Sequence, residues 1–403
     1  MRRAKIEDVP TLLKLARMVH FINLPADKDI IAEKVQWSRQ CFLGVGRRLK
    51  SDGTMGPEAG AGAESSNGKK KGAKSGDRGT GGGGGGNGGE GLAALHGWSK
   101  IFMFSLEDTE SHGVLGTSQI ITSMGGPGHP NLSFQLSRRE MFSETLQVGS
   151  THMVAKLKLD ESGPTEIGGL ILQPSYRGHK AKLGRFLSMV RFHFMGLYRP
   201  VVADRVIAEM MGPITPDGQN TLWEYLGRRF INLTYIEADR FCQYSKEFML
   251  SLLPREEIYL TLLPPEARRI IAQVGPETEP ARRMLEKLGF EYNNCIDPFD
   301  GGPTIEANTD AISLVKATRR LRVGEPLKAA EMKEEGGTVE AMVSVMEGDG
   351  EFVAVQGKCV VEGDVVRLGR EEMEGLGVEK GGAVGWTPVG VERKMKKTSP
   401  QRH

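Results

Sequence analysis

One turn in the sequence combines the residue types that bind an anion. The apolar stretch EIGGLILQP (166–174) predicts a strand, and RFLSMVRFHFM (185–195) has the apolar spacing of an amphipathic helix. Basic side chains lie between these elements and directly after the turn: Arg177, Lys180, Lys182 and Arg185. Helix N-terminal N–H groups attract phosphate, glycine lets a ligand approach the backbone, and basic side chains add charge. The turn SYRGHKAKLG (175–184) therefore predicts a pyrophosphate site, although an ordinary connection has the same pattern.

A second element lies further along the chain. ARRMLEKLGFEY (281–292) predicts a helix that ends at Gly289 and a strand that begins at Phe290. By itself it also fits an ordinary helix with a glycine stop. Together, the two elements resemble the acetyl-CoA-binding signature of the GCN5-related N-acyltransferase superfamily. In that superfamily an R-x-x-G-x-G/A turn holds the CoA pyrophosphate, and a helix ending in KxGF packs beside the pantetheine arm.

Further segments resemble one family, the arginine N-succinyltransferases. In chain order they are RRAKIEDVPTLLKLA, LPAD, FMFSLED, LILQPSYRG, LSMVRFHFMG, VIAEMMG, LWEYLGRRF, AQVGPETEPARRMLEKLGF and IDPFDGGPTIEA. The last of these and the AEM-x-G strand (208–212) are the most specific to the family, and the resemblance covers residues 2–320 apart from a Gly-rich insertion. It implies transfer of succinyl from succinyl-CoA to the α-amino group of L-arginine, the reaction that opens the succinyltransferase route of arginine catabolism. Succinyl-CoA would be the co-substrate, and no metal would be required.

The resemblance also assigns roles to individual residues. It implies that backbone N–H groups of the strand hold the thioester carbonyl and that the turn binds CoA, through Leu170, Ile171, Leu172, Arg177, Gly178, Gly184 and Arg185. The turn is longer here than in the family, with lysine and alanine in its middle. The family's proton-donor histidine, just before a proline, is replaced by Gly275. Glycine cannot carry a proton, so Glu277 is the candidate catalytic acid, although it also fits a solvated residue at the start of a helix.

Recognition of the arginine acceptor requires carboxylates. A guanidinium is held best by planar, bidentate partners. The candidate substrate-binding residues are Glu209 on its strand and three acids around the FDGGPT turn: Asp297, Asp300 and Glu306. The alternative is a structural turn in which Asp300 caps the backbone.

Composition excludes several other classes of protein. The 53 basic and 51 acidic residues leave a net charge of +2, which argues against a nucleic-acid-binding protein. The four cysteines (41, 242, 295, 359) form no CxxC pair, and no HExxH spacing occurs, so a metal centre is not expected. The sequence shows neither an apolar stretch long enough to span a membrane nor a secretory signal. We therefore expect a cytoplasmic protein that binds no nucleic acid and no membrane.

The expected fold class is α/β (α+β), with a mixed, mostly antiparallel sheet flanked by helices, like that of the GCN5-related N-acyltransferases. Residues 1–45 and 93–320 would form the catalytic region, with helices up to residue 45. Alternating apolar residues predict a hairpin over 101–124 and further strands over 131–136, 151–158, 166–172 and 205–210, while helical spacing predicts helices over 183–197, 237–253 and 265–274. Residues 46–92, which contain many of the chain's 53 glycines, would be a disordered insertion. An all-β unit over 321–392 and a basic tail over 393–403 would complete the chain.

Three functions stay open. The first is arginine N-succinyltransferase, an acyltransferase acting on L-arginine and succinyl-CoA. The second is a divergent acyl-CoA-dependent N-acyltransferase that uses another amine or acyl group. The third is a catalytically impaired acyl-CoA-binding or regulatory subunit. The replaced histidine favours the last two, whereas the retained FDGGPTIEA segment favours the first. A homo-oligomer or a hetero-oligomer with a related subunit fits each of them.

Overall fold

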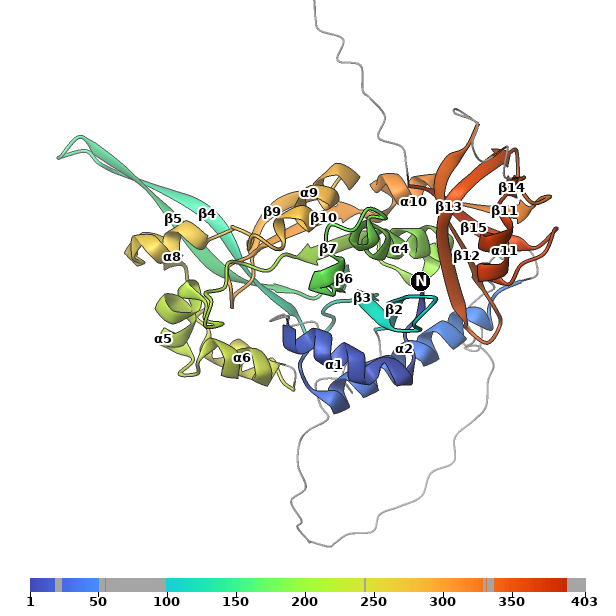
Figure 1. The fold of residues 1–403 in the computed structure, drawn as a ribbon. Coiled ribbons are helices and arrows are strands. Elements are labelled where there is room, and N and C mark those ends of the chain that lie inside the picture. The colour runs from blue at the N-terminus through green and yellow to red at the C-terminus, as the bar shows by residue number, and fades with distance from the viewer. Residues whose placement is uncertain are drawn as a thin grey trace, which may run out of the picture.

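A long, mostly antiparallel sheet with helices on both faces organises the chain (Figure 1). The computed structural model describes residues 1–18, 24–50, 55, 99–242, 244–328, 331 and 337–389. The basic tail (393–403) and the predicted insertion (46–92), apart from residues 46–50 and 55, lie outside the described residues. The boundaries predicted for the catalytic region and the C-terminal unit stay predictions.

The main sheet has the strand order β1-β2-β3-β6-β7-β10-β9-β4-β5-β8. Its strands are β1 (Arg2–Arg3), β2 (Ile101–Glu107), β3 (Val114–Ile121), β4 (Asn131–Ser143), β5 (Val148–Asp160), β6 (Thr165–Leu172), β7 (Arg205–Glu209), β8 (Ile258–Tyr259), β9 (Glu291–Ile296) and β10 (Pro303–Asn308). The β2–β3 hairpin and the strands predicted around residues 131, 151, 166 and 205 are confirmed.

Helices cover this sheet on both faces, because neighbouring residues of a strand point to opposite sides. Ile101 and Met103 of β2 pack against α1 (Val9–Met18) and α2 (Lys28–Gly46). Phe102 and Phe104 pack against α4 (Leu183–Leu197). The predicted helix over 183–197 is confirmed, and α9 (Glu279–Leu288) ends at Gly289 as its sequence predicts.

A second group of helices covers the far end of the sheet in Figure 1. It comprises a π-helical turn (Trp223–Gly227) followed by α5 (Arg228–Phe230), α6 (Tyr235–Cys242), α7 (Glu247–Leu252) and α8 (Pro265–Ile270). The helices predicted through 237–253 are confirmed as α6 and α7, with the non-helical residues 244–246 between them. Trp223 is fully buried in the core of this group and stacks on Phe299 at 5.0 Å between ring centroids.

The C-terminal unit closes on itself. Strands β11 (Arg319–Val323), β12 (Val339–Met346), β13 (Phe352–Glu362), β14 (Val365–Arg367) and β15 (Ala383–Pro388) pair in the ring β12-β15-β11-β14-β13-β12. The prediction of an all-β unit is wrong in one respect, because α11 (Arg370–Leu376) lies between β14 and β15. Short α10 (Ser313–Ala317) leads into this unit and packs against α4.

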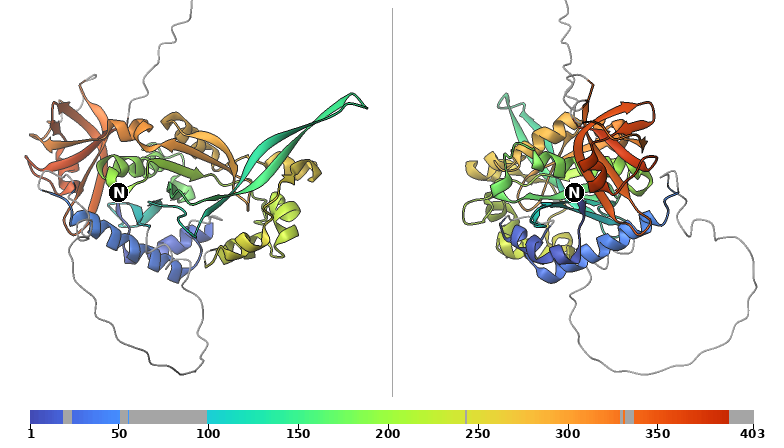
Figure 2. Two further views of the ribbon diagram at one scale, coloured as in Figure 1. Left: turned by 180° about the vertical axis from the view of Figure 1, so that it is seen from behind. Right: turned by 45° about the vertical axis from the view of Figure 1, so that its right-hand side comes forward.

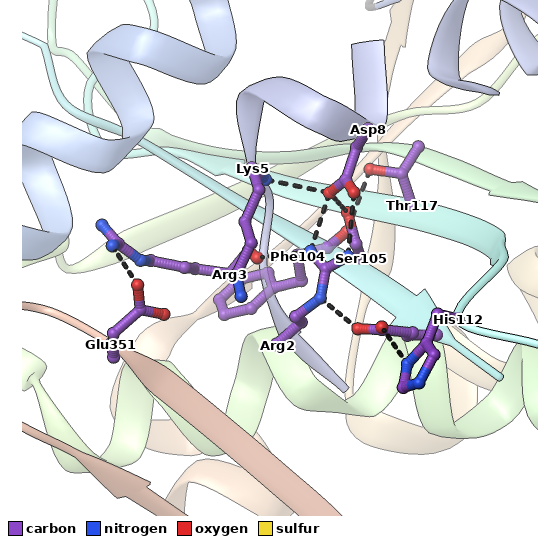
Figure 3. A network of polar contacts seen from close by, with 10 residues as sticks. Arg2, Arg3, Lys5, Asp8, Phe104, Ser105, His112, Thr117 and Glu351 are labelled. Atoms are coloured by element: carbon purple, nitrogen blue, oxygen red, sulfur yellow. Dashed lines mark hydrogen bonds and ion pairs between the residues drawn. The ribbon is translucent and has the colours of Figure 1, made fainter. Parts of the chain in front are cut away.

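The first strand joins this ring to the main sheet. β1 pairs with β2 on one side and with β13 on the other, so the prediction that the first 45 residues are helical is wrong here. Figure 3 shows the polar contacts that hold it. The Arg2 guanidinium donates two hydrogen bonds of 2.8 Å to Asp8 and pairs with Glu107, while Arg3 pairs with Glu351 next to β13. Two basic residues are too short a strand signal to recognise in sequence.

Candidate active site

Strands β6 and β7 diverge at the centre of the main sheet. They run parallel but pair only at Thr165–Val206 and Glu166–Ile207, although β6 continues to Leu172. On the other side of β6, the ladder with β3 shifts register around Gly169, whose φ is +57°. Backbone groups of 170–172 that point toward β7 therefore lie outside the sheet ladder. Such groups are available to a ligand.

The turn after β6 presents a helix N-terminus next to these strands. A single 3-10 turn (Pro174–Tyr176) is followed by Gly178 at φ +71° and by Lys182 at φ +52°, which precedes α4. No backbone acceptor is recorded in the described chain for the first two helical N–H groups, those of Leu183 and Gly184. The turn thus has the free N–H donors and positive helix end that favour an anion.

The two glycines of this turn serve different purposes. Gly178 has a left-handed backbone that other residues adopt with strain, so its conformation explains it. Gly184 has an ordinary helical backbone, and a Cβ added there would meet only the Leu172 side chain, at 3.6 Å. Neither packing nor conformation requires glycine at Gly184. A glycine at position 184 would allow a ligand to approach the backbone closely.

Two of the basic residues have partners within the chain. The Arg177 Nη1 donates to Glu277 Oε2 at 3.0 Å, which links the turn to the segment before α9. Arg185 donates through Nη2 to the backbone carbonyl of Val389, after β15. Lys180 and Lys182 are exposed at the tip of the turn. Charge for a phosphate is therefore present, but part of it is shared with Glu277 and with the C-terminal unit.

Three segments singled out by their motifs meet at one junction beyond β7. Gly275 donates from its backbone to Met211 O at 3.0 Å, and Ala272 donates to Gly301 O at 2.8 Å. The Asp300 carboxylate accepts from the backbone N–H groups of Gly212, at 2.9 Å, and Gly302, at 2.7 Å. The segment after β7, the loop before α9 and the FDGGP turn are thereby fixed to one another.

A cluster of acids lies at this junction, in which Asp300 is buried and Glu209 and Asp297 are half-buried. Burial raises the pKa of Asp300 to about 6; its backbone hydrogen bonds act in the opposite direction, and the charge of Glu209 adds to the rise. Burial and then the charges of Asp300 and Glu209 raise the pKa of Asp297 well above its usual range. The structure therefore brings three of the four predicted substrate-binding acids, Glu209, Asp297 and Asp300, together.

Two members of the cluster were not predicted. Asp239 and Tyr235 lie on α6, and burial followed by the charge of Asp300 raises the pKa of Asp239 to about 6. Within the described residues, the buried Oδ1 atom of Asp239 has no hydrogen-bond partner. Burial, followed by the charge of Asp300, raises the pKa of Tyr235 far above its usual value. An acid on an amphipathic helix gives no sequence signal that separates it from a solvated one.

The other predicted residues lie apart from this cluster or on its edge. Glu306 is paired with Arg205 at 2.9 Å and also accepts from Asn293 at 2.9 Å, so its carboxylate is already engaged. Glu209 accepts from the Asn131 side chain at 2.9 Å. The Glu277 side chain is 64% exposed and is bonded to Arg177.

Within the described residues, no group of three or more His, Cys, Asp or Glu side chains has the geometry to hold a metal ion. The helices of the same part of the chain include none that is long and apolar enough to cross a bilayer.

Comparison with known proteins identifies the family of the chain. The sequence profile of the family described as "Arginine N-succinyltransferase beta subunit" matches residues 93–314. The "Arginine N-succinyltransferase" of Yersinia enterocolitica (serotype O:8 / biotype 1B) is 38% identical over 223 residues, which are 55% of this chain and 64% of that enzyme, less than two thirds of it. The enzyme of the same name from Yersinia pestis (strain Pestoides F) is 34% identical over 286 residues, 70% of this chain and 80% of that enzyme.

A solved structure is similar over nearly the whole chain. It is that of arginine/ornithine succinyltransferase subunit AI from Pseudomonas aeruginosa, with a TM-score of 0.70 and 26% identity, covering 97% of this chain and 98% of that one. The family predicted from the sequence motifs is thereby confirmed, and the chain belongs to the arginine N-succinyltransferase family of acyltransferases.

Proposed function

We propose that the chain transfers the succinyl group of succinyl-CoA to the α-amino group of L-arginine by direct attack within a ternary complex. One observation carries the proposal: β6 and β7 diverge, and hydrogen bonds from Arg177 to Glu277 and from Gly275 to Met211 link the turn after β6 to the acid cluster after β7. This arrangement suits an acyl-CoA on one side and a cationic amine on the other. It also supports a GCN5-related N-acyltransferase-like reading of the sheet. Location in the cytoplasm stays a prediction.

The donor would bind along β6 and its turn. We propose that the N–H groups at the start of α4 and the charges of Arg177, Lys180 and Lys182 hold the CoA pyrophosphate. The N–H groups of 170–172 that face β7 would hold the thioester oxygen as it gains charge in the tetrahedral intermediate. The amine nitrogen forms the new bond to the acyl carbon, the carbon–sulfur bond breaks, and the thiolate takes up a proton to leave as free CoA.

The acceptor would bind at the acid cluster. Burial raises the pKa values of Asp239, Asp297 and Asp300, and the negative charge of neighbouring carboxylates adds to the rise. A guanidinium placed among them would replace repulsion by charge-assisted hydrogen bonds. We therefore propose Glu209, Asp297, Asp300 and Asp239 as the arginine-binding set, with Glu306 in a separate ion pair with Arg205.

Asp239→Asn is expected to stabilise the protein and to weaken arginine binding. The folded-state pKa of Asp239, about 6, lies above the usual 3.8. The contribution of this residue to the free energy of unfolding is therefore fully present below pH ~4 and is lost as the pH rises through 6. At pH 7.5 the amide should raise the free energy of unfolding by about 1–3 kcal/mol, and KM for arginine should rise about tenfold or more. Urea denaturation at pH 4.5 and 7.5 and initial rates measure both effects.

The control for Asp239→Asn is the exposed Glu256→Gln. It should change neither the pH dependence of stability nor the KM for arginine. A variant Asp239→Asn that is less stable than the parent protein at pH 7.5, or that keeps its KM, would remove Asp239 from the proposed site.

Gly184→Ala is expected to separate folding from donor binding. Alanine has the higher helix propensity, and its Cβ has room beside Leu172, so stability should be unchanged or rise by up to about 1 kcal/mol. A phosphate lying on the helix end would meet the new methyl group, so the Kd for CoA should rise severalfold or more. Calorimetric titration with CoA measures it, with Gly44→Ala, also in a helix and with no atom within 4 Å of the added Cβ, as the control.

A direct assay tests the proposed function. The protein is given succinyl-CoA or acetyl-CoA with arginine, ornithine or no amine, and release of free thiol is followed. Release that requires both succinyl-CoA and arginine is expected. Thiol release with acetyl-CoA but not with succinyl-CoA would support a different acyl specificity. CoA binding without thiol release for any amine would support a regulatory subunit. The assay includes these two alternatives because the buried Gly275, which the resemblance aligns with the family histidine, cannot carry a proton.

A further inference from the structure

The β4–β5 hairpin extends far beyond the sheet that it starts from. The two strands pair with each other along their whole length, from Asn131–Asp160 to Ser143–Val148. The body of the protein pairs with them only near the base, through β9 at Phe134 and Gln135 and through β8 at Val154 and Ala155. Figures 1 and 2 show the outer part reaching away from every other described element. We call residues 136–153 the arm.

The arm exposes apolar side chains and an unpaired strand edge. Its outer part exposes large apolar side chains, including Phe142 (64%), Leu146 (73%) and Val148 (60%). A two-stranded ribbon without a packed face is marginally stable in water, and a free strand edge is a template for another strand. A partner strand on the free edge of the arm would stabilise the ribbon and cover apolar side chains such as Phe142.

A local feature of β9 leaves the outer edge of β4 free. The β4–β9 ladder ends at Gln135, next to Asn294, which has a left-handed backbone with φ +59°. The Gln135 side chain donates to the backbone carbonyls of Asn293 and Asn294 and fixes the chain where it turns away. Beyond this point no strand pairs with the outer edge of β4 over 136–143 in the described structure.

We propose that this edge is an interface between two copies of the chain, paired antiparallel about a two-fold axis through Arg139. With a two-fold axis perpendicular to the ribbon, the even-numbered side chains of both copies lie on one face of the shared sheet. Arg138 of one copy then lies opposite Glu140 of the other, and Leu136 lies opposite Phe142. Each contact occurs twice, so the edge is complementary to itself in charge and in apolar surface.

Neighbouring registers lack this complementarity. With the axis one residue earlier, Leu136 would face Glu140. With the axis one residue later, Arg138 would face Phe142. Register in a sheet is set by such facing pairs. The sequence of the edge therefore favours the axis at Arg139 and a ladder over 136–142. The ladder cannot extend to residues 134 and 135, because β9 pairs with them.

The residue on the axis is already neutralised within its own chain. Arg139 Nε donates to Glu257 Oε2 at 2.9 Å, and its second nitrogen pairs with the other carboxylate oxygen. Two arginines meeting on the axis thus each bring their own counter-charge. Arg138 and Glu140 are exposed, and no ion pair is recorded for either in the part of the chain that the structure describes.

Charge exchange on the full-length protein tests the interface. Sedimentation velocity over a dilution series should show a dimer. Arg138→Glu should weaken it at least about tenfold, since it puts like charges opposite each other twice. The double variant Arg138→Glu/Glu140→Arg should restore the parent affinity, because both pairs re-form with reversed sign. Circular dichroism and thermal melting of each variant confirm the fold.

A disulfide on the axis tests the register. Arg139→Cys places two thiols opposite each other, at a Cβ separation of roughly 5 Å, and mild oxidation should give a covalent dimer. Gln147→Cys, at the exposed tip of the same arm, is the matched control and should not cross-link. The four native cysteines are buried and do not compete.

Three results would overturn the proposal: a monomer at all concentrations, a dimer unaffected by Arg138→Glu, or equal cross-linking of the two cysteine variants. Association that occurs only with a related subunit falls under the first of these.

Discussion

Gly302→Ala is expected to destabilise the protein by about 3 kcal/mol or more. A Cβ at this position would lie 1.9 Å from the carbonyl oxygen of Met210 and 2.7 Å from the backbone nitrogen of Gly212. Both atoms belong to the backbone, so no side chain can rotate away to make room. The segment after β7 and the FDGGP turn would have to separate. Chemical denaturation of the variant measures the loss.

Gly348→Ala is the matched control, since its Cβ meets nothing within 4 Å and its φ is not positive. It should change stability by less than about 0.5 kcal/mol. If Gly302→Ala is as stable as this control, the close contact between the two segments does not exist. If it folds but no longer binds arginine, the junction positions the acid cluster without being needed for folding.

The same contact explains why the motif has its sequence. Asp300 must reach the N–H groups of both Gly212 and Gly302, and this is possible only where the two backbones touch. Glycine at both positions permits the contact. A buried carboxylate that accepts from two backbone donors is a structural cap. Burial, and to a smaller extent the charge of Glu209, raises the pKa of the same carboxylate to about 6. The two readings of Asp300 that the sequence left open are therefore compatible.

The sequence predicted the helices and strands where the apolar periodicity was strong and a glycine or turn residue marked the end of the element. The spacing from Leu183 to Leu197, the strand before it and the glycine after Leu288 predicted α4, β6 and the end of α9 with small errors. The acids of the FDGGP turn were found because they cluster in the chain. Tyr235 and Asp239 were not predicted, because α6 is distant from the FDGGP turn in sequence and lies beside its acids only in the folded chain.

The outer arm was missed for a different reason. Alternation of apolar and polar residues marks a strand only when one face is buried. Residues 137–143 are exposed or partly exposed on both faces, so SRREMFS shows no such pattern and the strand was predicted to end at Leu136. The pairing of Arg177 with Glu277 was equally invisible, since it joins residues 100 positions apart in sequence.

Gly275→His is expected to raise kcat by about tenfold to a hundredfold. Gly275 is buried beside the end of β7, and a Cβ there would lie 3.3 Å from the carbonyl oxygen of Gly212. Its φ is not in the left-handed region, so a histidine can adopt the backbone with a shift of a few tenths of an ångström. An imidazole at this junction would supply the proton that the leaving thiolate needs, a contribution of up to about 10²–10⁴-fold in other enzymes.

The pH profile distinguishes proton donation from a packing effect. An imidazolium donor loses its proton near its ordinary pKa of about 6.5, so kcat of Gly275→His should fall as pH rises through that value. Gly275→Ala makes the same contact with Gly212 without a titrating group, and it should leave kcat and its pH profile unchanged. An equal gain in both variants would attribute the effect to packing, and no gain in either would show that thiolate protonation does not limit this enzyme. Asp239 and Asp300, whose pKa values are raised to about 6, are present in both variants, so an ionisation seen only in Gly275→His belongs to the introduced histidine.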